Sequence, residues 1–400
     1  VSILGYAYWK VTADMHSMDT AEKMLPPILM GITGTVLVFW SLSGFILQVV
    51  QMRRKTYLKD TNMFVLRQIN NKINTMVASM SVICLMLFMT ITILSSSLAL
   101  RNSMERNLIE MTPVDLNLTK TANLQETYKK YGREVKSTEE QREDSKISII
   151  ETMENNGFDM SNLKDVIEIP IYTTNNLNWH VFFGYKIDDI RSRYPMLQYD
   201  TKEEIIKISD YNKVAKLYGI QEYELNSDEY IVLCNFNSME NLRNEVLIDG
   251  TNKLTIAGIE YKSKYNECKD GYVLMSGSHI NTGIILVPDD CPLKEEDKER
   301  KLLVANYNAT TDEDKEKIEN LLTDESNFVQ NLNNKGLELD GSTKISIMEA
   351  SIGLATIVTF IAIYLGIIFL IASSAILALK QLTESSDNKQ RYLILRKNDK

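Results

Sequence analysis

The chain has 400 residues, and its 53 acidic and 44 basic side chains give a formal net charge of −9 at neutral pH. We expect no nucleic-acid partner, because proteins that bind nucleic acid present a strong excess of cationic charge. The charges are spread unevenly, and none lies in residues 25–52, 73–100 or 350–379. Each run exceeds the roughly 20 apolar residues that cross a bilayer core of about 30 Å, so the sequence predicts a membrane protein.

The expected fold class is a membrane α-helical protein with three complete transmembrane helices, the end of a fourth, and a large α+β extracellular domain. In chain order we expect the helix end at 1–9, an external loop at 10–25, a transmembrane helix at 26–51, a cytoplasmic loop at 52–74, a transmembrane helix at 75–100, the extracellular domain at 101–346, a transmembrane helix at 347–379 and a cytoplasmic segment at 380–400. The apolar start, VSILGYAYW, suggests an excerpt of a longer protein.

The orientation is expected from the distribution of basic residues. Residues 53–74 hold six basic side chains against one acid, and residues 380–400 hold six against three. Both segments are therefore expected on the cytoplasmic side. Within the cytoplasmic loop, residues 61–76 place apolar side chains at helical spacing among polar ones, which indicates an amphipathic elbow helix on the inner membrane surface. Its characteristic residues are Phe64, Arg67 and Lys72.

The external segment carries the acidity of the protein. Residues 101–345 hold 30 basic and 45 acidic side chains, a formal charge of about −15. Solubility is the ordinary explanation, and attraction of cationic ligands is the alternative. The acid-rich stretches that are candidates for ligand steering are Glu295, Glu296, Asp297, Asp312, Glu313 and Asp314.

Both helical and strand periodicities occur within this segment. Helices are expected at 147–156, 201–208, 209–218 and 311–322, and strands at 166–172, 229–235, 254–261, 271–275 and 283–288. Pro170 favours an edge position for its strand. Ser209 or Asp210 is expected to cap the helix that Gly219 ends.

The sequence offers no catalytic or metal-binding pattern. Three cysteines, Cys234, Cys268 and Cys291, lie in the external segment, and a bridge between the last two stays open because connectivity cannot be read from spacing. Residues 336–344 have P-loop-like spacing, but Ser342 stands at the lysine position. Ser276 precedes His279 closely, yet sequence proximity does not make a triad. We expect no catalytic residue, no metal and no cofactor bound by this chain.

The last apolar helix leads into a compact cationic element with Arg391, Tyr392, Leu395 and Arg396 at helical spacing. Such an element can dock on a cytoplasmic protein or anchor on anionic lipid, and composition does not separate the two. Several stretches of this kind resemble the FtsX-like ABC transporter permeases, in particular their bacitracin-type, antimicrobial-peptide-resistance branch. The resemblance is carried by YLGIIF at 364–369, residues 380–392 and 394–397, the elbow residues, TPVD at 112–115 and SDYN at 209–212. Asn398 and Asp399 depart from the family pattern, which usually has an apolar residue and a glycine there.

The resemblance implies a permease subunit that senses and removes or detoxifies antimicrobial peptides at the cell envelope. It implies that a separate ATP-binding subunit holds ATP and Mg, that Arg391, Tyr392, Leu395 and Arg396 form the ATPase-coupling element, and that a membrane histidine kinase is a further partner. The ligand would be a cationic antimicrobial peptide or its lipid-bound complex, and the location the cell membrane. A lipoprotein-releasing or drug-export permease, and a non-transport signalling protein that activates a cell-wall hydrolase, remain alternatives.

Overall fold

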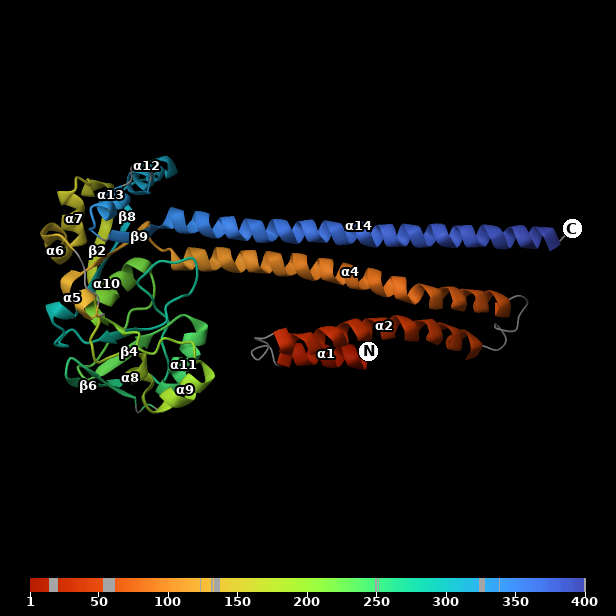
Figure 1. The fold of residues 1–400 in the computed structure, drawn as a ribbon, viewed down its shortest axis with the longest axis horizontal. Coiled ribbons are helices and arrows are strands. Elements are labelled where there is room, and N and C mark those ends of the chain that lie inside the picture. The colour runs from red at the N-terminus through yellow and green to blue at the C-terminus, as the bar shows by residue number, and fades with distance from the viewer. Residues whose placement is uncertain are drawn as a thin grey trace. The chain divides into compact units, whose positions relative to one another are not determined.

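The computed structural model describes the whole chain except residues 14–20, 53–61, 123, 131, 133–136, 249, 251, 324–327, 338 and 399–400. Within helices, the side chains of several further residues, including those of 62–76 and 387–398, are also outside the description. The chain divides into a helical unit, Val1–Arg101 with Ala355–Lys400, and a domain unit, Asn102–Leu354. Figure 1 shows the elements of each unit along the chain.

The prediction of three complete transmembrane helices and the end of a fourth was wrong. Among the described residues, two helical stretches are long and apolar enough to cross a membrane, Val77–Met111 and Lys344–Thr383. Helix α1 (Ser2–Ala13) has 12 residues and extends about 18 Å at 1.5 Å per residue. Within the described residues, the apolar part of helix α2 (Ala21–Met52) is Leu25–Ser41. This stretch is shorter than the roughly 20 residues that span a bilayer.

The two long helices each contribute residues to both units. Helix α4 (Asn62–Met111) has 50 residues and α14 (Lys344–Asn398) has 55, which corresponds to about 75 and 80 Å. Within the helical unit they pack closely, because a Cβ added at Gly366 would lie 3.4 Å from Thr90 and 3.5 Å from Leu94. Since both exceed the thickness of a hydrocarbon core, each continues as a helix well beyond its apolar part.

The domain unit is built on a mixed sheet of nine strands among the described residues, in the order β5-β6-β4-β7-β3-β2-β8-β1-β9. The strands are β1 (Leu116–Thr121), β2 (Leu163–Tyr172), β3 (Glu204–Lys207), β4 (Glu229–Leu233), β5 (Lys253–Ile256), β6 (Ile259–Ser263), β7 (Ile284–Val287), β8 (Lys298–Tyr307) and β9 (Leu339–Thr343). Most neighbours are antiparallel, but β3 with β7 and β4 with β6 are parallel. The expected mixture of helices and strands in this segment is present.

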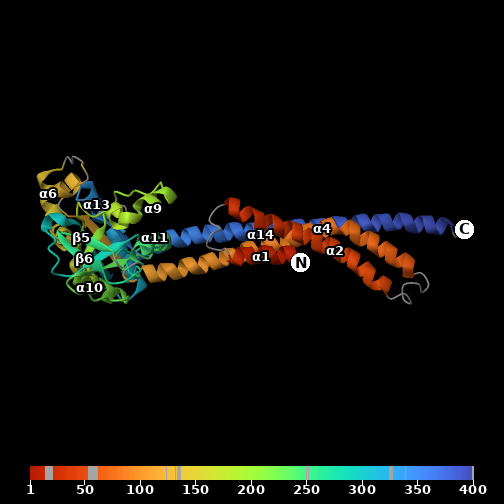
Figure 2. The ribbon, with the colours of Figure 1, turned by 90° about the horizontal axis from the view of Figure 1, so that it is seen from below.

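The shorter helices cover the sheet on two faces. They are α5 (Leu124–Lys130), α6 (Glu139–Lys146), α7 (Ile149–Asn155), α8 (Trp179–Phe183), α9 (Ile187–Arg193), α10 (Ile208–Tyr218), α11 (Asn237–Leu247), α12 (Asp312–Thr323) and α13 (Phe328–Asn334). Figure 2 shows α10 on one side of the domain and α6, α9 and α13 on the other. Alternate side chains along each strand point to opposite faces, so the sheet contributes to a core on each side.

Three clusters of buried side chains form this core. One lies under α10 and takes residues from strands on both sides of the β2–β3 contact, for example Ile171, Ile206 and Leu302. On the opposite face, a second cluster includes Phe182, Ile205 and Val246. A third, on the β1 and β8 end, joins α7, α12 and α13. The cluster under α10 therefore ties together two halves of the sheet that have separate cores on the other face.

The sheet is loosely joined between β2 and β3. Strand β2 follows β8 along its length but pairs with β3 at one position only, Tyr172 with Ile205. Pro170 was predicted to place its strand at the edge of the sheet, and β2 lies inside it instead. Because the side of β2 that faces β3 forms so little ladder, a residue without an N–H is tolerated there.

Several local predictions were also wrong. Residues 201–208 contain β3 rather than a helix, because the apolar pair Ile205 and Ile206 splits between the two faces of the sheet. Residues 271–275 form no strand. The strand expected at 254–261 is the hairpin β5–β6, which turns at Ala257 and Gly258, both with positive φ. Helix α10 ends at Gly219 as expected, but its N-cap is Lys207, and the Asp289 carboxylate accepts the Ser209 N–H at 3.1 Å.

Candidate functional site

The C-terminal end of α4 is fixed in the domain by the segment 272–284. Met111, the last residue of α4, is 1% exposed, and its carbonyl accepts the Ser276 N–H at 3.3 Å. The Tyr272 hydroxyl donates to the Glu110 carbonyl at 2.5 Å. The last carbonyls of a helix have no partner within the helix. The segment supplies those partners and thereby holds α4 in place.

The N-terminal end of α14 is fixed by its own cap and by the edge of the sheet. Ser346 N–H donates to the Thr343 hydroxyl at 3.0 Å, and Thr343 N–H donates to the Ser346 hydroxyl at 3.1 Å. Strand β9, which ends at Thr343, pairs antiparallel with β1 over five residue pairs. Gly341 is required in that pairing, because an added Cβ would meet the backbone carbonyl of Asn117.

Both helices therefore join the same end of the sheet. Helix α4 leads into β1 through a short connection, β9 leads directly into α14, and β1 and β9 are neighbours. Segment 272–284 also contacts α14, since a Cβ added at Gly277 would lie 2.7 Å from the Ser351 hydroxyl. We call this group of contacts, made by Glu110, Met111, Tyr272, Ser276, Gly277, Thr343 and Ser351, the helix–sheet junction.

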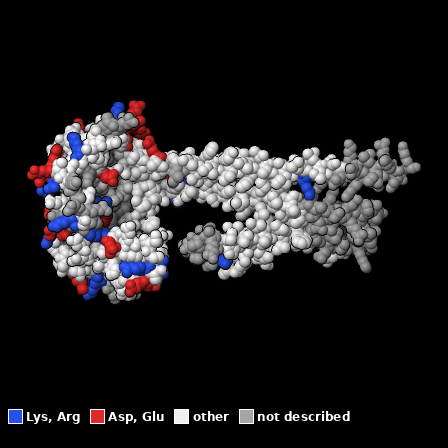
Figure 3. Space-filling view, in the orientation of Figure 1, with Lys and Arg blue, Asp and Glu red and all other residues white. Residues whose placement is uncertain are grey.

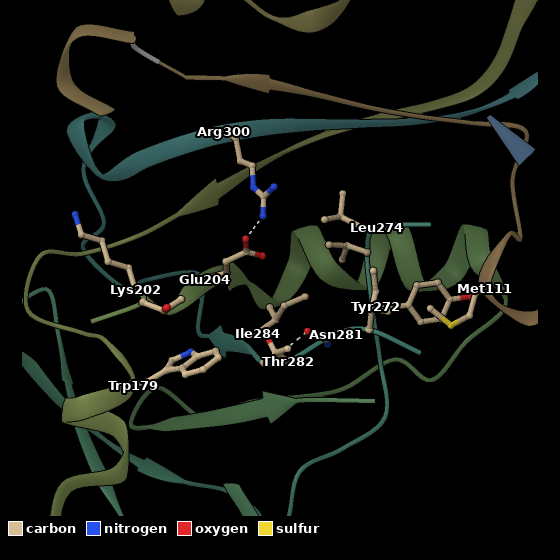
Figure 4. Close-up of a pocket in the computed structure, with 14 residues that line it drawn as sticks. Met111, Trp179, Lys202, Glu204, Tyr272, Leu274, Asn281, Thr282, Ile284 and Arg300 are labelled. Carbon is tan, nitrogen blue, oxygen red and sulfur yellow. Dashed lines mark hydrogen bonds and ion pairs between the residues drawn. The ribbon is translucent and has the colours of Figure 1, made fainter. Parts of the chain in front are cut away.

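A pocket adjoins the junction. Its cavity volume is about 200 Å³, and Met111, Trp179, Tyr272, Ile280 and Ile284 supply apolar and aromatic walls. Figure 4 shows Met111 and Tyr272 at one end of the pocket and Trp179 at the other. Ligand pockets for drug-sized molecules hold about 300–1,000 Å³. This one is suited to a single side chain or a similarly small apolar group.

The charged residues of the pocket are already paired. Arg300 on β8 forms an ion pair with Glu204 on β3, and the Lys202 ammonium donates to the Asn175 side chain at 2.9 Å. The Arg300–Glu204 pair links β8 to β3, the two strands that flank β2 in the sheet. A ligand in the pocket would lie against this pair and the end of α4 at the same time.

A buried ion pair supports the segment that lines the pocket. Arg243 on α11 binds the Glu203 carboxylate through two nitrogens at 3.0 and 2.8 Å, and both side chains are at most 1% exposed. The Arg243 Nε donates to the Thr282 carbonyl at 2.6 Å, and its guanidinium lies 4.5 Å from the Phe182 ring centroid. Gly283, with φ of +150°, leaves the space that this guanidinium occupies.

The Ser276 and His279 side chains contact other groups rather than each other. The Ser276 hydroxyl donates to the Ser278 carbonyl rather than to a base, and His279 faces Glu110 at 3.9 Å. In the described part of the chain, no three side chains of His, Cys, Asp or Glu gather where they could hold a metal ion. The attachments of the two long helices and a small pocket lie together in the domain.

The predicted coupling and elbow residues lie on the two long helices. Arg391, Tyr392, Leu395 and Arg396 belong to the last turns of α14, and Phe64, Arg67 and Lys72 to the first turns of α4. Their side chains are outside the described residues, so their assigned roles stay predictions. The elbow and the following apolar stretch form one continuous helix.

The six predicted steering residues lie on the surface of the domain, where Figure 3 shows charged side chains of both signs. Lysines pair with three of them: Glu295 with Lys298 at 2.7 Å, Glu296 with Lys294 at 3.2 Å and Asp314 with Lys317 at 2.7 Å. The Asp297 carboxylate accepts the Lys294 N–H. Asp312 and Glu313 lie in the first turn of α12, where acids stabilise a helix. The local negative field is therefore weaker than the sequence suggests.

Sequence reasoning did not find the junction or the Arg243–Glu203 pair. Neither has a local signature, because their members are far apart in the chain and only the sheet brings them together. A comparison of the sequence with models of known families and with curated proteins finds no match. The resemblance to FtsX-like permeases thus rests on the sequence stretches named above.

Proposed function

We propose that this chain is the permease subunit of an ATP-driven complex that senses and removes antimicrobial peptides at the cell envelope. In this account α4 and α14 cross the membrane, and the domain unit lies outside the cell. An ATP-binding subunit with ATP and Mg acts on the cytoplasmic end of α14, and a membrane histidine kinase is a further partner. The chain itself transmits movement and carries out no chemistry.

The helix–sheet junction is the observation that carries the proposal. Because the two helices are attached to neighbouring strands, a shift of one helix against the other would directly change the relative position of those strands. A shift of α14 along its axis would pull β9 against β1. The hydrogen-bonded cap at Thr343 and the burial of Met111 attach the two helix ends firmly to the domain. Packed elements respond to such displacement by moving between discrete arrangements rather than by stretching.

The pocket supplies the point at which a ligand would act on this joint. It lies where the two halves of the sheet are loosely connected, and Met111 forms part of its wall. A peptide side chain that enters it would favour one relative position of the sheet halves and of the α4 end. A ligand shifts such an equilibrium only by its difference in affinity for the two states.

The orientation rests on the charge asymmetry of the sequence. Basic residues after Leu379 favour the cytoplasmic side for the end of α14, which places the domain on the other side of the membrane. A cysteine introduced at Ser137 should react with a membrane-impermeant maleimide in intact cells, and one at Ser385 only after permeabilisation. Reaction at Ser385 in intact cells contradicts this orientation.

The functional test is charge reversal at the cytoplasmic exit of α14. In the complex of this chain with its ATP-binding subunit, Arg396→Glu should abolish stimulation of ATP hydrolysis by a cationic peptide, because the contact with the ATPase is reversed in charge. The matched control is Lys317→Glu, which reverses an exposed charge on α12, where the side chain is 73% exposed. The control should keep stimulation. Equal stimulation in all three proteins would refute the coupling role.

A further inference from the structure

Two of the cysteines come together in the core of the domain. Cys234 directly follows β4, and Cys268 precedes Lys269, which bridges to Leu233 in parallel register. The bridge is closed by Cys234 N–H to the Lys269 carbonyl at 2.9 Å and Lys269 N–H to the Val232 carbonyl at 2.8 Å. Because neighbouring residues of a strand point to opposite faces, both cysteines point away from the side taken by Leu233. Both belong to the same buried cluster.

The bridge at Lys269 places Cys234 and Cys268 next to each other, and Cys291 is not part of this pair. Cys291 lies in the same cluster, where burial raises the pKa of its thiol. The bridge between Cys268 and Cys291 that the sequence left open is therefore not the one that the packing favours. Cys268 also lies in a stretch without regular secondary structure, between β6 and the single bridge at Lys269. Its backbone can thus adjust when its sulfur approaches that of Cys234.

We propose that Cys234 and Cys268 form a redox-active pair that is converted to a disulfide by a low-molecular-weight disulfide. This goes beyond the proposed function and does not depend on it. The Cys234 thiolate attacks one sulfur of the oxidant, R–S–S–R, which releases one thiolate and leaves a mixed disulfide. The Cys268 thiolate then attacks Cys234 Sγ and releases the second. The two thiol protons pass to the two leaving thiolates, so the sum is one protein disulfide and two R–SH.

The environments of the two thiols suit these different roles. The neighbouring Cys268 thiol, with a further contribution from the Arg243 charge, lowers the pKa of Cys234. The neighbouring Cys234 thiol and burial raise the pKa of Cys268. The thiolate is the attacking species in disulfide exchange, so Cys234 reacts first and Cys268 resolves. Because Cys234 and Cys268 are 2% and 6% exposed, exchange requires opening of the stretch that carries Cys268 and is slow in the folded protein.

Oxidation would act on the segment that holds both long helices. The reduced Cys234 thiol donates to the Asn281 carbonyl at 3.2 Å, and that carbonyl also accepts the N–H groups of Asn235 and Phe236. A disulfide has no S–H, so this contact to segment 272–284 is lost. At the same time the bridge closes a loop of about 35 residues, which stabilises the domain by restricting the unfolded chain.

The test counts thiols in the full-length protein in detergent. The protein is incubated with oxidised glutathione, denatured in an alkylating reagent and digested for mass spectrometry. We expect one linked pair, Cys234 with Cys268, with Cys84 and Cys291 alkylated, and a rise of about 10 °C in the unfolding midpoint of the domain. Cys291→Ser should preserve the linked pair, and Cys234→Ser and Cys268→Ser should each abolish it.

Two results would overturn the proposal. One is alkylation of all four cysteines after incubation at a temperature close to the unfolding midpoint, where opening is frequent. The other is a linked pair that contains Cys291 in the otherwise unaltered protein. Cys234→Ser and Cys268→Ser each replace a single atom in the core, so their far-ultraviolet circular dichroism should match that of the unaltered protein. Loss of the link in these variants then results from the missing thiol and not from misfolding.

Discussion

The buried ion pair of Arg243 and Glu203 gives the sharpest prediction for stability. Glu203→Gln keeps the size of the side chain and removes its charge, which leaves the Arg243 guanidinium charged in the core. The exposed fraction of the two side chains is 0% and 1%, so water cannot replace the lost partner. Removal of one member of a buried pair costs about 3–5 kcal/mol of unfolding free energy. For a domain of this size that is a fall of about 10 °C in the unfolding midpoint.

The assay is thermal and urea unfolding of the full-length protein in detergent, followed by the fluorescence of the domain. The matched control is Glu245→Gln, which breaks an ion pair with Arg193 of similar length, 2.6 Å, whose side chains are 36% and 38% exposed. Exposed pairs contribute less than about 1 kcal/mol, so the control should shift the midpoint by 3 °C at most. If Glu203→Gln costs no more than the control, the pair is not stabilising the core as described.

Two other substitutions test neighbouring features. Gly283→Ala should destabilise the domain by about 3 kcal/mol, because its Cβ would meet the Arg243 guanidinium at a positive φ. The control Gly353→Ala adds a Cβ that meets open space on α14, so it should be neutral or slightly stabilising. Equal effects of the two substitutions in urea unfolding would refute the steric argument. Burial raises the pKa of Tyr223 to about 12 from an ordinary value of 10.0, so its stabilising contribution is complete below pH 10 and is lost as the pH rises toward 12. Tyr223→Phe should therefore show a smaller loss of stability over that range, and parallel curves for the two proteins would contradict it.

The sequence predicted best those features that are encoded locally. The helix at α10 ends at Gly219 because only that residue adopts the left-handed conformation at low cost, with φ of +70°. The two long apolar stretches of α4 and α14 are visible as charge-free runs. In the third charge-free run, residues 25–52, the apolar stretch within the described residues is Leu25–Ser41.

The features that sequence reasoning missed depend on contacts between distant residues. The apolar pair in residues 201–208 fits either a helix or a strand. The segment forms a strand because it pairs with β7. The Ser209 N–H in the first turn of α10 donates to Asp289, about 80 residues away along the chain. The partner of Cys268 stayed open in the sequence, and the bridge at Lys269 brings Cys234 to it. Each choice required the order of the strands, which no local pattern contains.

The central claim is that α4 and α14 move against each other at the helix–sheet junction when the partner subunit binds ATP. The direct measurement is the distance between spin labels at Arg106 on α4 and Glu349 on α14, by pulsed electron paramagnetic resonance, in the assembled complex. Both positions are exposed. We expect the distance distribution to shift when a non-hydrolysable ATP analogue is bound and to stay unchanged in Arg396→Glu. Identical distributions with and without the analogue in the unaltered complex would contradict the account.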